Sequence, residues 1–337
     1  MAGERNERRL VSVIALPTRR VRFGGVIDPS TIAAYGLLVV TVGTYLALDP
    51  GTMTLDRVAT LLAQRLPLVF VAIGQTIVVM SRGFDLSVAG TVALTNVVVA
   101  TTMGAGPGGV AWGVATGLGV GLGAGIFNGL FVGYLRLPAI IVTLATWSIL
   151  AGLALYVLPQ PGGFVATGFA DFPHQRVGPI SVAFIALVTV PGLLWWPISR
   201  SRLGYRLLAV GGDERAAYES GVEVARTKVV AFVLCGLFAS IGGLFLTMQA
   251  TSGDPRIGDP FTLNSIAAVA LGGALLSGGR ASVAASVAGA LVIGTLPNVL
   301  FLAGVSTYWQ FIVAGTVLVL AVTVSEISRR RVDAGAT

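Results

Sequence analysis

Residues able to do covalent or metal chemistry are few in this chain. It contains one cysteine, Cys235, one histidine, His174, and one lysine, Lys228. A single thiol cannot build a disulfide framework or a thiolate metal site, and a single histidine excludes the usual catalytic triads and zinc motifs. No glycine-rich loop ends in Gly-Lys-Ser/Thr, so the usual phosphate-binding loop is absent. We therefore expect no catalytic residue, no metal site and no cofactor in this chain.

A second group of polar residues stands inside or beside long apolar segments. A carboxylate or amide in such a place either bonds a neighbouring helix or faces a water-filled path. Asp85 either caps the helix that follows it, with Ser87 beside it, or ends a broken helix that lines a polar cavity. Arg82, three residues earlier, is the expected counter-charge. The candidates for a translocation path are Asp85, Ser87, Asn128, Thr143, Asn264 and Asn298.

The segment 200–228 is the one charge-rich island in the second half of the chain. Within GGDERAAYESG, the two glycines allow a sharp turn, Asp213 suits a helix N-cap, and Gly221 suits a helix stop. We predict a short helix at about Glu214 to Ser220 that either docks on a partner or is an ordinary surface helix. The candidates for partner contact are Gly211, Gly212, Asp213, Glu214, Arg215, Ala216, Ala217 and Gly221.

The elements that carry these residues are too apolar for a water-soluble fold. Hydrophobic residues make up 55% of the chain and charged residues 11%, with a mean hydropathy of +0.86, whereas charged residues approach a quarter of a soluble domain. Segments such as LVVTVGTYLAL are apolar on all sides, unlike the alternating strands of a membrane barrel. A membrane helix needs about 20 apolar residues, so we predict an all-α polytopic membrane protein with about ten transmembrane helices. The expected spans are residues 30–48, 66–82, 86–103, 109–135, 138–158, 179–198, 229–250, 261–279, 282–303 and 306–326.

The distribution of positive charge predicts the orientation of these spans. Basic residues in short loops stay in the cytoplasm, and ten spans with both ends inside leave only four of the 22 basic residues in outer segments. These four are Arg57, Arg65, Arg176 and Arg256. The net charge of +7 is thus an orientation signal rather than a nucleic-acid-binding surface. We expect cytoplasmic tails at 1–29 and 327–337, and a transmembrane domain at 30–326 with the cytoplasmic loop 200–228.

Several segments resemble one family of transporters. GGDERAAYESGVEVARTK is similar to the cytoplasmic coupling loop of bacterial ABC-importer permeases for monosaccharides such as ribose, xylose, arabinose and galactofuranose. SRGFDLSVAG, GIFNGLFVGYLRLPAIIVTLATWSILAG and IAAVALGGALLSGGRAS resemble further segments of these permeases, which belong to the branched-chain amino acid and sugar permease superfamily. The resemblance runs from about Pro67 to Ser325. Arg82, Phe84 and Ala89 stand where the family usually has Gly, Ile and Gly, and Asp213 replaces a common Asn.

This resemblance implies a half-transporter in the bacterial inner membrane. In such importers two permease subunits form the pore, as a homodimer or heterodimer. A cytoplasmic ATPase pair binds ATP and Mg and grips the coupling loops, and an extracytoplasmic binding protein delivers the sugar. A permease of the same superfamily for branched-chain amino acids, nucleosides, riboflavin or a signalling sugar is an alternative. From other classes, the alternatives are a secondary transporter driven by an ion gradient and a structural membrane anchor.

A weak internal similarity suggests two halves of five spans each. GFDLSVAGTVAL around Asp85 and GDPFTLNSIAAV around Asp259 occupy matching places in these halves. Because each half has an odd number of spans, the second half would be inverted relative to the first.

Overall fold

The computed structural model describes residues 29–52 and 54–306, together with a few positions between 308 and 323. In this part of the chain the structure is helical, apart from loops and one small antiparallel hairpin. The hairpin pairs β1 (Arg176–Val177) with β2 (Ile180–Ser181). The predicted all-α class is confirmed. The N-terminal tail before Pro29, most of the tenth predicted span (306–326) and the tail 327–337 lie outside the described residues.

The apolar helices of the described residues follow the first nine predicted spans in order. They are α2 (Pro29–Leu48), α3 (Leu55–Met80), α4 (Val88–Thr102), α5 (Gly106–Gly133), α6 (Ala139–Val157), α8 (Val182–Arg200), α11 (Val224–Ala250), α12 (Phe261–Leu271) and α13 (Val283–Leu302). Seven of these are long and apolar enough to cross a membrane, whereas α4 and α12 are shorter apolar helices. Short turns of helix at η1 (Pro50–Thr52), α7 (Thr167–Ala170) and η2 (Phe172–His174) lie in the connections.

The prediction of one span over 261–279 is wrong, because α12 ends at Leu271. Beyond it, Gly273, Gly278 and Gly279 adopt positive φ angles of 75°, 93° and 80°. Glycine adopts this left-handed conformation readily, and it stops a right-handed helix. The residues after Leu271 therefore form a loop rather than the end of a helix, although they include the apolar run Ala274, Leu275 and Leu276.

The span predicted at 66–82 is the C-terminal part of a longer helix. α3 begins at Leu55, where the side chain of Thr54 accepts a hydrogen bond from the backbone N–H of Arg57. Arg57 and Arg65, which were expected in an outer loop, thus lie within α3. The capped start extends the helix beyond the apolar stretch from which the span was predicted.

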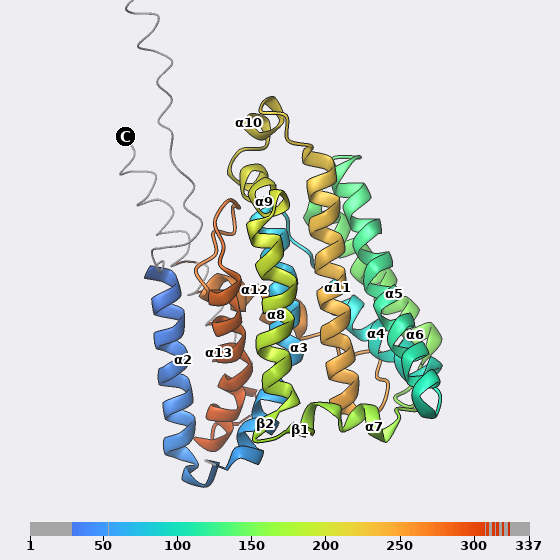
Figure 1. Ribbon diagram of the computed structural model, residues 1–337, viewed down its shortest axis with the longest axis vertical. Coiled ribbons are helices and arrows are strands. Elements are labelled where there is room, and N and C mark those ends of the chain that lie inside the picture. The colour runs from blue at the N-terminus through green and yellow to red at the C-terminus, as the bar shows by residue number, and fades with distance from the viewer. Residues whose placement is uncertain are drawn as a thin grey trace, which may run out of the picture.

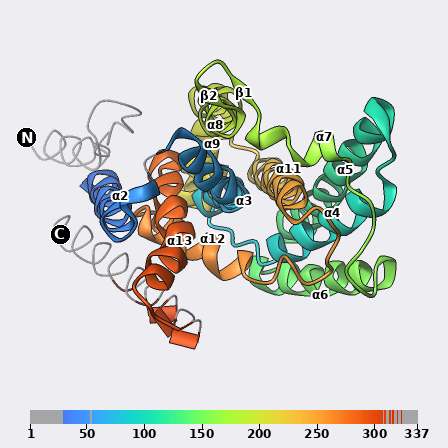
Figure 2. The ribbon, with the colours of Figure 1, turned by 90° about the horizontal axis from the view of Figure 1, so that it is seen from below.

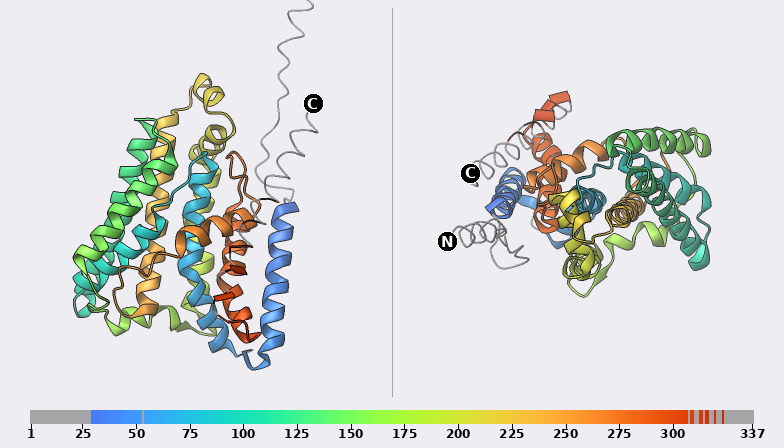
Figure 3. Two further views of the ribbon diagram at one scale, coloured as in Figure 1. Left: turned by 180° about the vertical axis from the view of Figure 1, so that it is seen from behind. Right: turned by 90° about the horizontal axis from the view of Figure 1, so that it is seen from above.

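Two central helices organise the bundle. α3 and α11 lie side by side, with α12 and α13 next to α3, and α4 and α5 next to α11 (Figure 2). α9 (Arg202–Gly212) and α10 (Glu214–Glu219) lie at one end of the bundle, and β1, β2 and α7 lie at the other (Figure 1). The views from behind and above in Figure 3 show the same arrangement. Successive membrane helices run in alternating directions between these ends, as a multi-pass membrane protein requires.

Glycines allow α5 and α11 to pack with their backbones in close contact. A Cβ atom on Gly121 would lie 2.1 Å from the carbonyl oxygen of Gly236, and a Cβ on Gly236 would lie 2.1 Å from that of Gly121. One turn further along α5, a Cβ on Gly125 would lie 2.5 Å from the carbonyl oxygen of Phe232. Small residues are the usual means of close helix packing in membranes, and this pair forms a tight glycine seam within the bundle.

The two short helices begin close to one another. The hydroxyl of Thr262, in the first turn of α12, donates a hydrogen bond of 3.0 Å to the carbonyl of Leu86, just before α4. A Cβ on Gly258 would lie 2.1 Å from the carbonyl of Ala89 in α4. Each short helix follows a non-helical segment after a central helix, α3 or α11. These parallels are compatible with an inverted repeat, which stays a prediction.

Candidate functional site

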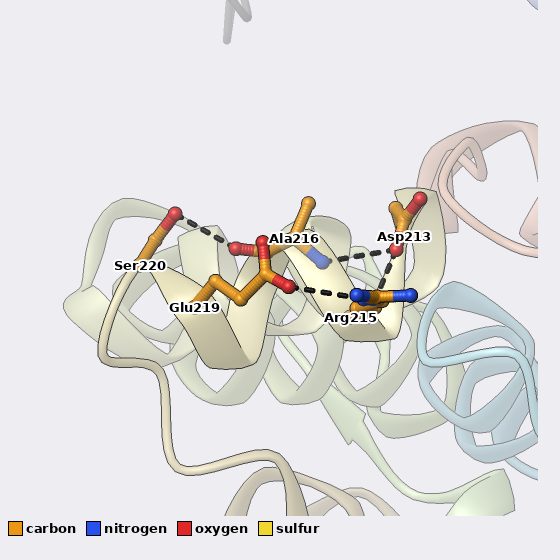
Figure 4. A network of polar contacts seen from close by, with 5 residues as sticks. All are labelled: Asp213, Arg215, Ala216, Glu219 and Ser220. Atoms are coloured by element: carbon orange, nitrogen blue, oxygen red, sulfur yellow. Dashed lines mark hydrogen bonds and ion pairs between the residues drawn. The ribbon is translucent and has the colours of Figure 1, made fainter.

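A short exposed helix, α10, lies at the end of the bundle where α3 ends and α11 begins. It spans Glu214–Glu219, close to the predicted range of Glu214 to Ser220. The carboxylate of Asp213 caps it by accepting hydrogen bonds of 2.8 Å and 3.0 Å from the backbone N–H groups of Arg215 and Ala216 (Figure 4). These bonds favour the ionised carboxylate and hold the pKa of Asp213 below its ordinary value.

The other end of α10 closes on a glycine. Gly221 has a φ angle of 80°, and the N–H of Val222 donates to the carbonyl of Ala217, which fastens the last turn. Ala217 is buried against the bundle, whereas Ala216 and Tyr218 face outward. Tyr218 is 69% exposed. α10 therefore has one side packed on the bundle and an exposed outer face.

The predicted turn at Gly211 and Gly212 is wrong, because both residues belong to helix α9. The chain turns one residue later, at Asp213, whose extended backbone conformation separates α9 from α10. Gly211 is needed for close packing instead. A Cβ there would lie 1.8 Å from the carbonyl oxygen of Met80 and 2.5 Å from the backbone nitrogen of Gly279.

The end of α9, the end of α3 and the loop between α12 and α13 thus meet at one point, which we call the α3–α9 junction, formed by Met80, Arg82, Gly211, Gly212 and Ser277–Gly279. The N–H of Gly279 donates to the carbonyl of Met80 at 3.3 Å. Arg82 donates from Nε to the carbonyl of Ser277 at 3.0 Å and from Nη2 to the carbonyl of Gly212 at 3.2 Å. One guanidinium at the end of α3 therefore holds the residue before Asp213 and the loop after α12 together.

Ion pairs complete the attachment of α10. The ammonium of Lys228, in the first turns of α11, pairs with the carboxylate of Glu214. On the exposed surface of α10, Arg215 pairs with Glu219 at 3.0 Å, one helical turn away (Figure 4). The Lys228 side chain is only 15% exposed, so its pair is screened less by solvent than the exposed one. α10 is thus linked to α11 directly and to α3 through the junction.

A cleft of about 840 Å³ separates α10 from the turn between α5 and α6. Its walls carry charged side chains of both signs, among them Arg136, Arg215 and Glu223. Hydrophobic and charged groups around an open cleft suit a protein partner rather than a buried small-molecule site.

A second polar cluster is buried where α4, α5 and α6 meet. One carboxylate oxygen of Asp85 accepts hydrogen bonds from the backbone N–H and the hydroxyl of Ser87, at 2.9 Å and 2.5 Å. The amide of Asn128 donates to the Ser87 hydroxyl at 2.8 Å and accepts from the hydroxyl of Thr146 at 2.6 Å. These four side chains, which we call the Asp85 cluster, are at most 3% exposed.

Two expectations about Asp85 need correction. Asp85 does not cap α4, because α4 begins at Val88 and Ser87 occupies the N-cap position. Arg82 is not its counter-charge, because the guanidinium of Arg82 bonds the carbonyls of the junction. Hydroxyl and amide groups of Ser87 and Asn128 satisfy the carboxylate instead.

The remaining path candidates are spread over the bundle. Thr143 is buried near the Asp85 cluster and donates to the carbonyl of Phe84 at 3.3 Å. Asn264 in α12 and Asn298 in α13 are half-buried and lie on other helices. Sequence reasoning missed Thr146, although it lies on the same helix as Thr143 and three residues further on, where both face the same neighbours.

Known proteins with similar sequences cover most of this chain. Residues 57–322 match the family described as branched-chain amino acid transport system / permease component. The ribose import permease protein of Bacillus subtilis (strain 168) is 36% identical over 90% of this chain and 94% of its own length. The ribose import permease protein of Escherichia coli (strain K12) is 34% identical over 85% and 91%. No solved structure matches the chain.

A third relative is named for a different sugar. The L-arabinose transport system permease protein of Escherichia coli (strain K12) is 37% identical over 75% of this chain and 77% of its own length. The family match covers well over half of the sequence and includes α10, the junction and the Asp85 cluster. This chain therefore belongs to the family of branched-chain amino acid transport system permease components.

Proposed function

We propose that this chain is the membrane-spanning permease subunit of an ATP-driven ABC importer that carries a monosaccharide. The sugar import permeases among its relatives support the solute class, and α10, a capped helix with an exposed outer face, is the observation that carries the coupling. A cytoplasmic ATPase would bind α10, and ATP and Mg would be held by that partner. A second permease subunit would complete the pore, and an extracytoplasmic binding protein would deliver the sugar. The assembly would lie in the bacterial inner membrane with both termini of this chain in the cytoplasm.

Force would reach the bundle by two routes. When the ATPase pair closes on ATP, it would move α10. The ion pair between Lys228 and Glu214 would pass this motion to α11 and, through the tight glycine seam, to α5. The guanidinium of Arg82 would pass it to the end of α3 and to the loop that leads back to α12. Alternating access would follow because α5 and α11 pack against the short helix α4, and α3 packs against the short helix α12.

The buried polar groups suit a path for a neutral, polyhydroxylated solute. The Asp85 cluster offers hydroxyl and amide groups at the start of α4, where a helix is interrupted within the bundle. Such groups exchange hydrogen bonds with sugar hydroxyls as donors and as acceptors. The permease should hold the sugar only loosely, because a tight site would slow its release, and selectivity would reside mainly in the binding protein.

Substitutions at the base of α10 test the coupling. In the intact complex, Gly212→Val and Glu214→Lys should lower the amount of sugar taken up per ATP hydrolysed. Glu214→Lys opposes Lys228 with a like charge, so the double change with Lys228→Glu should restore part of the loss. Unchanged coupling in both single variants would refute the proposed role of α10.

A branched-chain amino acid is the second candidate solute, because the description of the matched family names this class. Competition with unlabelled leucine and with unlabelled ribose in the same uptake assay would separate the two. A secondary transporter would behave differently from both, since the permease alone would then take up solute until the ion gradient collapsed.

A further inference from the structure

Four buried side chains in the bundle have polar atoms without a hydrogen-bond partner among the described residues, and two of them, Gln75 and Ser286, lie on facing helices; the others are Arg65 and Trp147. Both amide atoms of Gln75, in the middle of α3, are without a partner, and so is the hydroxyl of Ser286 in α13. Both residues are 0% exposed. An unpaired polar group is costly where neither water nor protein can satisfy it, and native buried groups are nearly always paired. In a transporter, such a group can form its hydrogen bonds with the solute in another conformational state.

The register of α3 and α13 places these two residues at a similar depth. In the half of the bundle nearer to β1 and β2, Arg65 of α3 packs against Gly294 of α13. A Cβ on Gly294 would lie 2.8 Å from the arginine side chain. Gln75 lies ten residues beyond Arg65, about 15 Å along its helix. Ser286 lies eight residues before Gly294, about 12 Å along the antiparallel helix. The two groups are therefore within about one helical turn of each other in depth.

Helical periodicity directs both residues toward α12. Gly74 faces α11, where a Cβ would meet the backbone of Cys235, and Arg65 faces α13. At 100° per residue, Gln75 points between these two directions. α12 and α8 flank α3 on opposite sides (Figure 2), and the right-handed turn of α3 selects the side of α12.

Ser286 is directed to the same seam from α13. Gly289 faces α12, where a Cβ would lie 2.2 Å from the carbonyl of Ala268, and Gly294 faces α3. Ser286 lies between these two directions on the helix. Its backbone nitrogen is also 2.7 Å from the position of a Cβ on Gly272, at the end of α12. Gln75 and Ser286 thus lie beneath the C-terminal end of α12, in what we call the α12 seam.

The element that covers this seam is short and tied to the coupling apparatus. α12 has 11 residues, and the loop after it is fastened to the α3–α9 junction through Ser277 and Gly279. A displacement of α9 by the ATPase would therefore pull on the loop that ends α12. The left-handed glycines in that loop, Gly273, Gly278 and Gly279, give it a backbone that other residues would rarely adopt.

We infer that Gln75 and Ser286 form a second polar contact for the transported solute, covered by α12 in this state and uncovered when α12 moves. The amide offers two donors and an acceptor, and the hydroxyl offers one donor, which suits a neutral polyhydroxylated solute. This inference rests on the proposed transport of a sugar. The Asp85 cluster lies among α4, α5 and α6, whereas this second contact lies between α3, α12 and α13.

The variant Gln75→Leu should lose transport activity without losing stability. Gln75→Leu removes an amide without a partner, so the melting temperature of the purified permease should stay the same or rise. Uptake of labelled ribose by the intact complex should fall about fivefold, the effect of one lost hydrogen bond. The matched control is Asn96→Leu, because the buried amide of Asn96 bonds Thr247, Ser252 and Asp254. That variant should melt at a lower temperature. Unchanged uptake in Gln75→Leu, or a melting point that falls as in Asn96→Leu, would overturn the inference.

A labelling experiment separates this inference from the proposed function. In a Cys235→Ser background, Gln75→Cys in the intact complex should react with a small methanethiosulfonate reagent faster during ATP hydrolysis than without nucleotide. Ile73→Cys is the control, because Ile73 is 0% exposed and lies on a different face of α3. Equal labelling of the Gln75→Cys variant in all conditions would overturn the uncovering of the seam. If the wild-type complex takes up no sugar while this labelling still depends on ATP, the solute assignment fails and the uncovering stands.

Discussion

The guanidinium of Arg82 donates a hydrogen bond to the carbonyl oxygen of Gly212, 130 residues away in the sequence. Arg82 follows the central helix α3, and Gly212 is the last residue of α9. A second hydrogen bond from the same guanidinium reaches Ser277 in the loop after α12. The end of α9, just before the exposed helix α10, is therefore fixed to two parts of the bundle by one side chain, and this gives the proposed coupling a defined mechanical route.

Loss of this side chain should uncouple ATP hydrolysis from transport. Arg82→Gln shortens the side chain and removes both hydrogen bonds to the carbonyls of Gly212 and Ser277. We expect ATP hydrolysis by the intact complex to continue, while sugar uptake per ATP falls several-fold, since each lost bond is equivalent to about 1 kcal/mol. Arg57→Gln is the matched control, because Arg57 pairs with Asp49 at the other end of the bundle. Equal coupling in the Arg82→Gln variant and the wild type would contradict the route.

The two adjacent glycines at the end of α9 should respond differently to alanine. A Cβ on Gly211 would overlap the carbonyl of Met80, whereas a Cβ on Gly212 would meet nothing within 4 Å. Gly211→Ala should therefore destabilise the permease by about 1–3 kcal/mol, the usual range for overpacking. Gly212→Ala should leave the melting temperature unchanged. Thermal unfolding of the detergent-purified permease measures both, and equal melting points would show that the junction is not tightly packed.

The cap of α10 should weaken in acid. Because Asp213 accepts two backbone hydrogen bonds as a carboxylate, its pKa in the folded protein is lowered. Its stabilising contribution is thus complete above the ordinary pKa of an aspartate, about 3.9, and is lost as the pH falls through the lower folded value. Asp213→Asn keeps an acceptor oxygen and should remove this pH dependence, while Asp213→Ala should expose the helix at every pH. Amide hydrogen exchange of residues 214–220 in nanodiscs, relative to Asp213→Asn at each pH, measures the effect. Parallel curves for the wild type and Asp213→Asn would show that the carboxylate is not the cap.

The Asp85 cluster should depend on its amide. Asn128→Leu removes the donor to Ser87 and the acceptor for Thr146, so it leaves buried polar groups without partners. We expect a loss of about 1–3 kcal/mol in the free energy of unfolding. Asn298→Leu is the control, because the half-buried Asn298 has no side-chain hydrogen bond among the described residues. A similar, small effect of both substitutions on the melting temperature would show that the cluster does not stabilise the start of α4.

Sequence reasoning was most successful where one physical variable decides the structure. The order of the membrane helices follows from the length of apolar segments, and the helix α10 follows from the local chemistry of Asp213 and Gly221. It failed for residues 261–279, because the apolar residues Ala274, Leu275 and Leu276 after α12 suggested that the helix continues. The glycines that end α12 act through backbone conformation, which hydropathy does not measure.

Partners distant in the sequence could not be inferred from spacing. The proximity of Arg82 to Asp85 in the sequence suggested an ion pair, but the end of α3 directs the arginine to backbone carbonyls of α9 and of the loop after α12. Gly211 and Gly212 look equivalent in the sequence, and only the approach of Met80 separates them. Gln75 is a single polar residue in an apolar span, and its lack of a partner becomes visible only when all its neighbours are placed.

The most direct test of the coupling is sugar uptake into proteoliposomes that contain this permease, with and without its ATPase and binding protein. Uptake should occur only in the complete assembly, should require ATP hydrolysis, and should be abolished when α10 is replaced by a glycine-serine linker. Uptake by the permease alone, or full ATP-dependent uptake without α10, would contradict the account.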